Sequence, residues 1–301
     1  MSLKLRLIVL NFFQYYIWGA WLLTIGTWWF QTQHWSGTSF GAIFSTMGIA
    51  SLFMPSLVGI VADKWINAER LYGMLQIAGA VVLFAIPHVG NPEQMFWVML
   101  LNMCFYMPTI SLAITVAYNA LKQDGLDVVN TYPPIRVWGT IGFIAATWTT
   151  SLLGFKASPT QFHVAAGASL LLGLYAFTLP KCPPRMGAAQ GRGLADRLGL
   201  TSFTLFKNRN MAVFFIFAML LGAALQLTNA YGDAFLSDFV KVPEYANLLT
   251  VKYSTIIISI SQFSETAFIL TIPFFLKRFG IKAVMTMSML AWVLRFGLFA
   301  L

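Results

Sequence analysis

Apolar residues in this chain come in long runs that are separated by short polar turns. Nine of these runs have about the 20 residues that a helix needs to cross roughly 30 Å of hydrocarbon. They cover residues 8–30, 40–61, 71–89, 95–121, 133–155, 161–179, 211–234, 250–276 and 281–301. The pattern predicts an all-α polytopic membrane protein with nine transmembrane helices.

Composition and charge placement agree with a membrane location. Hydrophobic residues make up 58% of the chain and charged residues 10%, whereas soluble domains carry about a quarter charged residues. The net charge of +9 does not indicate nucleic acid, because Lys and Arg gather in the turns on one side of the predicted membrane. The opposite side holds only Lys156, Lys241 and Lys252. By the positive-inside rule, this asymmetry predicts a cytoplasmic N-terminus.

One polar segment divides the chain. Residues 181–210 are rich in Pro, Gly and basic residues, and they separate six predicted helices in 1–180 from three in 211–301. This layout is typical of a transporter with two helical bundles and a cytoplasmic connector. Because the last apolar run reaches Leu301 without a polar tail, we expect the second bundle to be incomplete and to lack its last three helices.

The fifth predicted helix carries a polar face. Its start, PPIRVWGTIGF, places Arg136, Thr140 and Phe143 on one side through spacings of four and three residues. Pro133 and Pro134 predict that the helix begins there. Arg136 then lies in the first turn, where the positive end of the helix dipole disfavours a cation, so a compensating group is expected. We interpret this face as the lining of a substrate path in a membrane transporter.

The seventh predicted helix carries Gln226 and Asn229, three residues apart on one face. Two carboxamides supply uncharged donors and acceptors that suit the edge of a base or the hydroxyls of a sugar. The alternative is that they only hold neighbouring helices together.

The eighth predicted helix carries Gln262 and Glu265, again three residues apart, with Glu265 near the membrane midplane. Burying an ionised carboxylate there is expensive, which favours a functional role such as coupling solute movement to protons. The alternatives are a structural ion pair with Arg136 or Arg295, or a carboxylic acid that stays neutral.

Further polar positions leave more than one interpretation open. Gly59, Asp63 and Lys64 form GxxxDK at the inner end of the second helix, where the glycine would permit a close backbone approach. This motif indicates either a gating loop or an ordinary interfacial turn.

Two other helices carry polar residues inside the predicted membrane. On the first helix, Gln14 and Tyr15 fit a pocket wall or an interfacial aromatic belt equally well. On the fourth helix, Tyr106 and Thr109 indicate internal hydrogen bonding.

Sequence motifs for catalysis are missing. The chain has no nucleophile elbow, no HExxH and no P-loop, and no residues have metal-ligand spacing. Cys104 lies in an apolar run and Cys182 in a basic loop, so neither a disulfide nor a metal site is predicted. We expect a protein that is not an enzyme and that uses no cofactor or metal.

Several blocks resemble the bacterial nucleoside:proton symporter family of the major facilitator superfamily, and the resemblance runs the whole length of the chain. These blocks are QYYIWGAWLLTIG (14–26), PPIRVWGTIGFI (133–144), QLTN (226–229), SISQFSE (259–265) and FFLKRFGIK (274–282). The inner loop after Lys64 departs from the superfamily pattern, with WINAER in place of a glycine and a basic pair.

The resemblance implies a twelve-helix rocker-switch carrier that imports purine and pyrimidine nucleosides with protons across the bacterial inner membrane. We expect it to work as a monomer in the lipid bilayer, driven by the proton gradient, with no nucleic-acid partner. The implied pocket consists of Arg136, Thr140, Phe143, Gln226, Asn229, Gln262 and Glu265, with Glu265 as the proton-coupling residue. A sugar or polyol:proton symporter and a membrane fragment that binds solute without moving it remain as alternatives.

Overall fold

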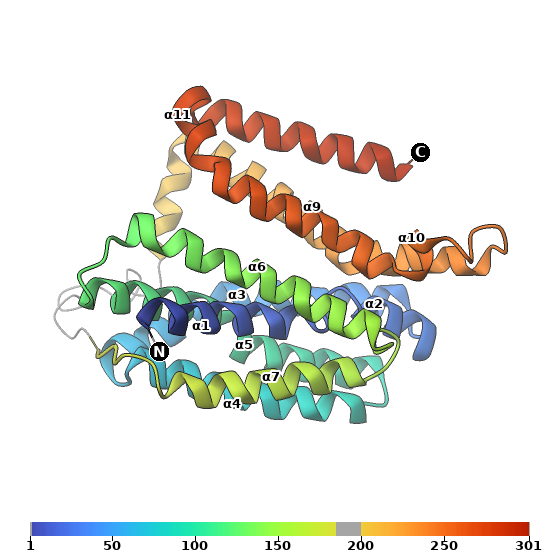
Figure 1. Cartoon of the computed structure of the whole chain (residues 1–301), viewed down its shortest axis with the longest axis horizontal. Coiled ribbons are helices and arrows are strands. Elements are labelled where there is room, and N and C mark those ends of the chain that lie inside the picture. Colours follow the sequence, from blue (N-terminus) through green and yellow to red (C-terminus); the bar gives the residue numbers. More distant parts are fainter. Residues whose placement is uncertain (1, 185–199, 301) are drawn as a thin grey trace.

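The computed structural model describes residues 2–184 and 200–300, and the regular elements in these two ranges are helical (Figure 1). In chain order they are α1 (Leu3–Gly19), α2 (Ile25–Thr27), η1 (Trp28–Thr32), α3 (Gly37–Lys64), α4 (Ala68–Ala85), η2 (Ile86–His88), α5 (Pro92–Gln123), α6 (Val128–Leu152), α7 (Thr160–Ala176), η3 (Leu200–Lys207), α9 (Arg209–Asp238), η4 (Phe239–Lys241), α10 (Leu249–Lys252) and α11 (Ser254–Ala300).

The helices form two groups. In the first, α1 to α7, α1 packs along α6, α3 packs along α5, and α4 packs against both α5 and α7. Its core holds large, fully buried side chains such as Trp28, Phe40 and Phe162. The second group, α9 to α11, lies on the α6 side of the first (Figure 1), through contacts of α6 with α11 and of α2 with α9.

Five helical stretches in the described ranges are long and apolar enough to cross a membrane. They are Gly37–Lys64, Ala68–His88, Pro92–Gln123, Arg209–Lys241 and Phe274–Leu298. The predicted count of nine is therefore not confirmed. One reason is length, because α1 and α7 have only 17 residues each.

The first predicted span, 8–30, is not one continuous helix. α1 ends at Gly19, and a short irregular stretch leads into α2 and the π-helix η1. Within that stretch the hydroxyl of Thr24 donates to the side-chain oxygen of Gln161 on α7 at 2.6 Å. A polar side chain that bonds across the bundle is compatible with a break in the helical ladder.

The predicted start of the fifth helix is wrong. α6 begins at Val128 and contains Pro133 and Pro134 in its interior. The start is fixed by Asp127, whose carboxylate caps the first turn by accepting a backbone N–H hydrogen bond. Arg136 therefore lies about 12 Å along the axis from the helix start, at 1.5 Å per residue, instead of in the first turn. This position puts about two helical turns between Arg136 and the start of α6.

The last two predicted spans, 250–276 and 281–301, fall largely in α11, and the first of them begins in α10. Gly280 has φ +73° and ψ 167°, so α11 consists of two helical segments that meet at a sharp turn. Side chains are strongly disfavoured in this backbone region, which explains why glycine occupies the turn. Of the predicted connector 181–210, residues 185–199 lie outside the described part of the chain, and η3 precedes α9.

Glycines let the backbones of α1 and α6 approach closely. A Cβ added at Gly142 would overlap the carbonyl oxygen of Phe12, and a Cβ at Gly19 would lie 2.5 Å from the carbonyl oxygen of Phe143. Small residues that permit this kind of contact are typical of helix pairs in membranes. The crossing sets the position of the polar face of α6 relative to α1.

We expect Gly142→Ala to lower the stability of the protein by about 1–3 kcal/mol, because the added methyl group meets rigid backbone. The midpoint of thermal unfolding in detergent measures this effect. Gly167→Ala on α7 is the control, since a Cβ there would meet nothing within 4 Å. An equal loss of stability in both variants would contradict the close crossing of α1 and α6.

Candidate functional site

Arg136 is held against α1 by an aromatic ring. Its guanidinium carbon lies 3.9 Å from the ring centre of Tyr15. Gly139 makes room for this pair, because a Cβ there would lie 2.5 Å from Tyr15 Cδ2 and 2.8 Å from Arg136 Nη1. A cation over an aromatic face gains about 0.5–2 kcal/mol, depending on desolvation. The compensating group expected for Arg136 is thus a π face.

One nitrogen of Arg136 lacks a partner. Nη1 is buried and has no hydrogen-bond partner in the part of the chain that the structure describes. Leaving a buried charged donor unpaired is costly, since it gives up water without gaining an acceptor. Nη1 therefore keeps an unused donor next to the Tyr15 ring.

Thr140 and Phe143 continue the same face of α6. Thr140 is buried and Phe143 is half-buried. The carbonyl oxygen of Phe143 accepts a hydrogen bond from the hydroxyl of Thr147 at 2.8 Å, which anchors this turn of the helix. The predicted spacing therefore gives one helix face with a cation, a hydroxyl and a ring.

The predicted amide pair on α9 is joined by a weak hydrogen bond. The side-chain nitrogen of Asn229 donates to the side-chain oxygen of Gln226 at 3.4 Å, and both residues are half-buried. Each amide keeps further donor and acceptor capacity, because a carboxamide can take part in several hydrogen bonds. The pair forms one polar patch on α9.

Gln262 on α11 is half-buried, and its amide nitrogen is best assigned toward the carbonyl oxygens of Ile258 and Ser259, at 3.0 and 3.1 Å. Glu265 belongs to the same helix, and its side chain lies outside the part of the chain that the structure describes. α11 meets α6 where the ring nitrogen of Trp148 donates to the hydroxyl of Ser259 at 2.8 Å. The predicted site residues of α6 and those of α11 thus lie on helices that contact each other.

The polar residues of the first helix serve mainly as scaffold. Gln14 is fully buried. Its side-chain oxygen accepts from Tyr72 at 2.6 Å and from Gln76 at 2.9 Å, and its nitrogen donates to Thr109 at 3.0 Å. Gln14 thus belongs to neither a pocket wall nor an aromatic belt. The prediction of internal hydrogen bonding on the fourth helix is confirmed, since Tyr106 also donates to the backbone oxygen of Gln14 at 2.6 Å.

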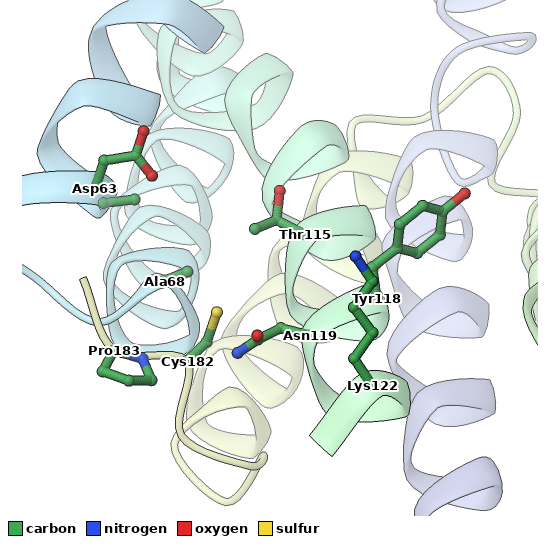
Figure 2. Close-up of a pocket in the computed structure, with 9 residues that line it drawn as sticks. Asp63, Ala68, Thr115, Tyr118, Asn119, Lys122, Cys182 and Pro183 are labelled. Carbon is green, nitrogen blue, oxygen red and sulfur yellow. The ribbon is translucent and has the colours of Figure 1, made fainter. Parts of the chain in front are cut away.

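The GxxxDK motif borders a cavity of about 240 Å³ at the basic end of the first group. Figure 2 shows Asp63 of α3 across from Thr115 and Asn119 of α5, with Cys182 and Pro183 beside them. Lys64 lies over the ring of Trp65, 5.5 Å from its centre. A Cβ at Gly59 would meet nothing within 4 Å, so the close backbone approach expected at this glycine does not occur. A gating role for Gly59, Asp63 and Lys64 stays a prediction.

Comparison with known proteins identifies the family. A family model described as nucleoside H+ symporter matches residues 1–301. The chain is 54% identical over 300 residues to the xanthosine permease of Escherichia coli (strain K12), and 51% identical to the nucleoside permease NupG of the same organism. Each alignment covers 100% of this chain and 72% of the relative. The chain belongs to the nucleoside H+ symporter family.

Solved structures agree with this membership. A crystal structure of a mutant of nucleoside transporter NupG matches with a TM-score of 0.94 at 50% identity, over 99% of this symporter-family chain and 74% of that chain. A second NupG crystal structure matches with a TM-score of 0.89. The predicted all-α membrane fold of the major facilitator type is confirmed, and the family is one of transporters.

Sequence reasoning missed one buried charge in this family member. Asp233 on α9 is buried and forms an ion pair with Lys156 in the turn between α6 and α7, with 3.3 Å between Oδ1 and Nζ. The available signal was a carboxylate at the end of an apolar run. Its partner was one of the few lysines on the less basic side. Nothing in the local pattern links two residues that are 77 positions apart.

Because Gln14 connects several helices, we expect Gln14→Leu to lower the free energy of unfolding by about 1–3 kcal/mol, as it leaves buried donors without their acceptor. Thermal unfolding in detergent measures the loss. Gln94→Leu, at an exposed position of α5, should change stability by less than about 0.5 kcal/mol. A Gln14 variant as stable as the parent would remove the scaffold role.

Proposed function

We propose that this chain is a proton-coupled nucleoside symporter that imports purine and pyrimidine nucleosides across the bacterial inner membrane by alternating access. Phe143 stacks on the base. Arg136 and Thr140 bind base or ribose oxygens, and the carboxamides of Gln226, Asn229 and Gln262 complete the polar contacts. Residues 1–180 and 211–301 act as the two bundles, joined by the connector 181–210.

The observation that carries this proposal is the buried Nη1 of Arg136, which has no hydrogen-bond partner among the described residues. A solute loses its hydration when it enters a transporter site. A hydrogen bond from a fixed cationic donor to an acceptor on the solute offsets part of that desolvation free energy. Nucleosides offer such acceptors in their base carbonyls and ribose oxygens. The family and the names of its relatives, a xanthosine permease and a nucleoside permease, support the same substrate class.

The depth of Arg136 supports an alternating-access site. Carriers bind solute near the membrane midplane, and the start of α6 at Val128, about two turns before Arg136, supports a position of Arg136 inside the membrane. The stacked Tyr15 ring and the space left by Gly139 hold the guanidinium in one orientation. Little conformational entropy is then lost on binding.

Glu265 is proposed as the proton-coupling residue. A carboxylate near the midplane is expensive to ionise unless water or a partner reaches it. Solute that enters or leaves the cavity changes that access, so occupancy and protonation become linked. The orientation with a cytoplasmic N-terminus follows from the distribution of Lys and Arg.

Thermal unfolding with a ligand panel tests the binding site. Uridine and xanthosine at about 100 times their dissociation constants should stabilise the purified protein by about 2.7 kcal/mol, because a ligand that binds only the folded state shifts unfolding by mass action. Arg136→Ala should weaken nucleoside affinity about 10- to 100-fold, since it removes a charge-assisted hydrogen bond. Arg70→Ala, at an exposed arginine, is the matched control and should leave affinity unchanged.

The same panel separates the alternatives. Stabilisation by ribose or polyols that equals the effect of nucleosides would favour a sugar carrier, which needs no stacking ring. Binding without exchange of labelled uridine across vesicles would favour a membrane protein that binds solute but does not move it.

Glu265→Gln tests proton coupling. The substitution keeps the shape of the side chain and removes its exchangeable proton, so uphill uptake driven by a pH gradient should fall to background while nucleoside counterflow persists. Uptake into vesicles with and without the gradient measures both. Glu244→Gln, at an exposed glutamate, should behave as the parent. Full uphill uptake in Glu265→Gln would assign coupling to another group.

A further inference from the structure

Asp233 is the centre of a buried polar cluster at the less basic end of the molecule. Oδ2 accepts a hydrogen bond from the hydroxyl of Thr27 at 2.5 Å. Oδ1 accepts from the hydroxyls of Ser254 and Thr255, each at 2.6 Å, and faces Lys156 Nζ at 3.3 Å. Burial removes the hydration of this carboxylate, so these donors have to replace the lost water contacts.

Lys156 makes several hydrogen bonds within the same cluster. Besides the carboxylate, its ammonium group donates to the hydroxyl of Ser237 at 2.7 Å and to that of Ser254 at 2.8 Å. Its side chain is 19% exposed, whereas that of Asp233 is fully buried. Breaking the pair would leave a buried charge without its partner, which is strongly unfavourable.

The cluster joins the two helical groups. Thr27 and Lys156 come from α2 and from the turn after α6, whereas Asp233 and its hydroxyl neighbours come from α9 and α11. Packing around the cluster is tight at the same end. A Cβ at Gly26 would lie 2.9 Å from the carbonyl oxygen of Ala230, and the rings of Phe40 and Tyr231 lie 5.2 Å apart.

The two groups approach each other at this end. In Figure 1, α9 and the segment of α11 before Gly280 come close to the first group near α2 and α10 and lie farther from it toward the turn at Gly280. The hydrogen bond between Trp148 and Ser259 lies in the converging half, close to the end of α6 and the start of α11.

We propose that the Asp233–Lys156 cluster is a latch that closes the outer end of the transport path, and that alternating access requires it to open. The cluster is the polar seam that must separate and hydrate before solute can enter from outside. This inference rests on the membrane orientation and the transport function proposed above. Its test uses no substrate, so its failure is distinguishable from a failure of nucleoside binding.

Accessibility from outside the cell reports the state of the latch. Ala230 is buried beside the cluster, so Ala230→Cys places a thiol in the closed seam. A membrane-impermeant maleimide added to intact cells should label it slowly, and the parent protein, whose Cys104 and Cys182 lie elsewhere, gives the background.

Two threonines provide a matched comparison. Thr27 and Thr255 are both fully buried, and each donates one hydroxyl hydrogen bond to Asp233, but only Thr27 does so across the two groups. In the Ala230→Cys background, Thr27→Val should raise the labelling rate several-fold, whereas Thr255→Val should leave it near the reference. Equal rates in the two variants would overturn the latch.

Removing the charge of Lys156 or Asp233 should raise the labelling rate more than Thr27→Val does. Lys156→Met or Asp233→Asn should raise labelling on the order of tenfold or more, because the closed state loses its ion pair while the open state does not. The exposed pair of Lys241 and Asp238, 2.6 Å apart at the same end, is the control.

Lys241→Met should leave labelling unchanged. If the Lys156 and Lys241 variants raise it equally, or if neither raises it while Thr27→Val also has no effect, the cluster is only structural. Thermal midpoints of all variants identify any that fail to fold, and for those the threonine pair decides.

Discussion

Hydrocarbon offers no hydrogen-bond partner, so each polar group in a membrane protein must find one inside the protein or in a water-filled path. Most of this structure follows from that constraint. The amide of Gln14 is satisfied by side chains from α4 and α5, and these contacts bind the first group into one unit. The carboxylate of Asp233 is satisfied by donors from both groups. Within the described residues, four buried side-chain atoms have no hydrogen-bond partner, and Nη1 of Arg136 is the one that belongs to a cation.

Two glutamines of this chain differ in their surroundings, and only the three-dimensional structure distinguishes them. Gln14 and Gln226 both lie in apolar helices. Gln14 has its oxygen and nitrogen engaged inside the bundle and is fully buried. Gln226 is half-buried and bonds only weakly to Asn229, which leaves its amide capacity available. An amide in an apolar helix can therefore be fully used between helices, as at Gln14, or keep free hydrogen-bonding capacity, as at Gln226.

Sequence reasoning predicted the features that depend on local pattern. Apolar run lengths gave the membrane class, and helical spacing gave the shared face of Arg136 and Phe143. It misplaced the start of α6, because it relied on the preference of Pro133 and Pro134 for a first turn and overlooked Asp127 as the N-cap residue. The Asp233–Lys156 pair was out of reach, since it depends on how distant helices meet. Bundle geometry, not any local preference, decides such pairs.

The close crossing of α1 and α6 has a consequence for how a carrier of this kind would work. Arg136 and the Tyr15 ring beneath it belong to helices whose backbones touch through Gly142 and Gly19, so they cannot shift relative to each other without breaking the crossing. In a carrier whose two groups rock against each other, a solute bound to the guanidinium would therefore keep its position relative to the first group. The contacts that change during the cycle would be those that the second group makes with the first group and with the solute.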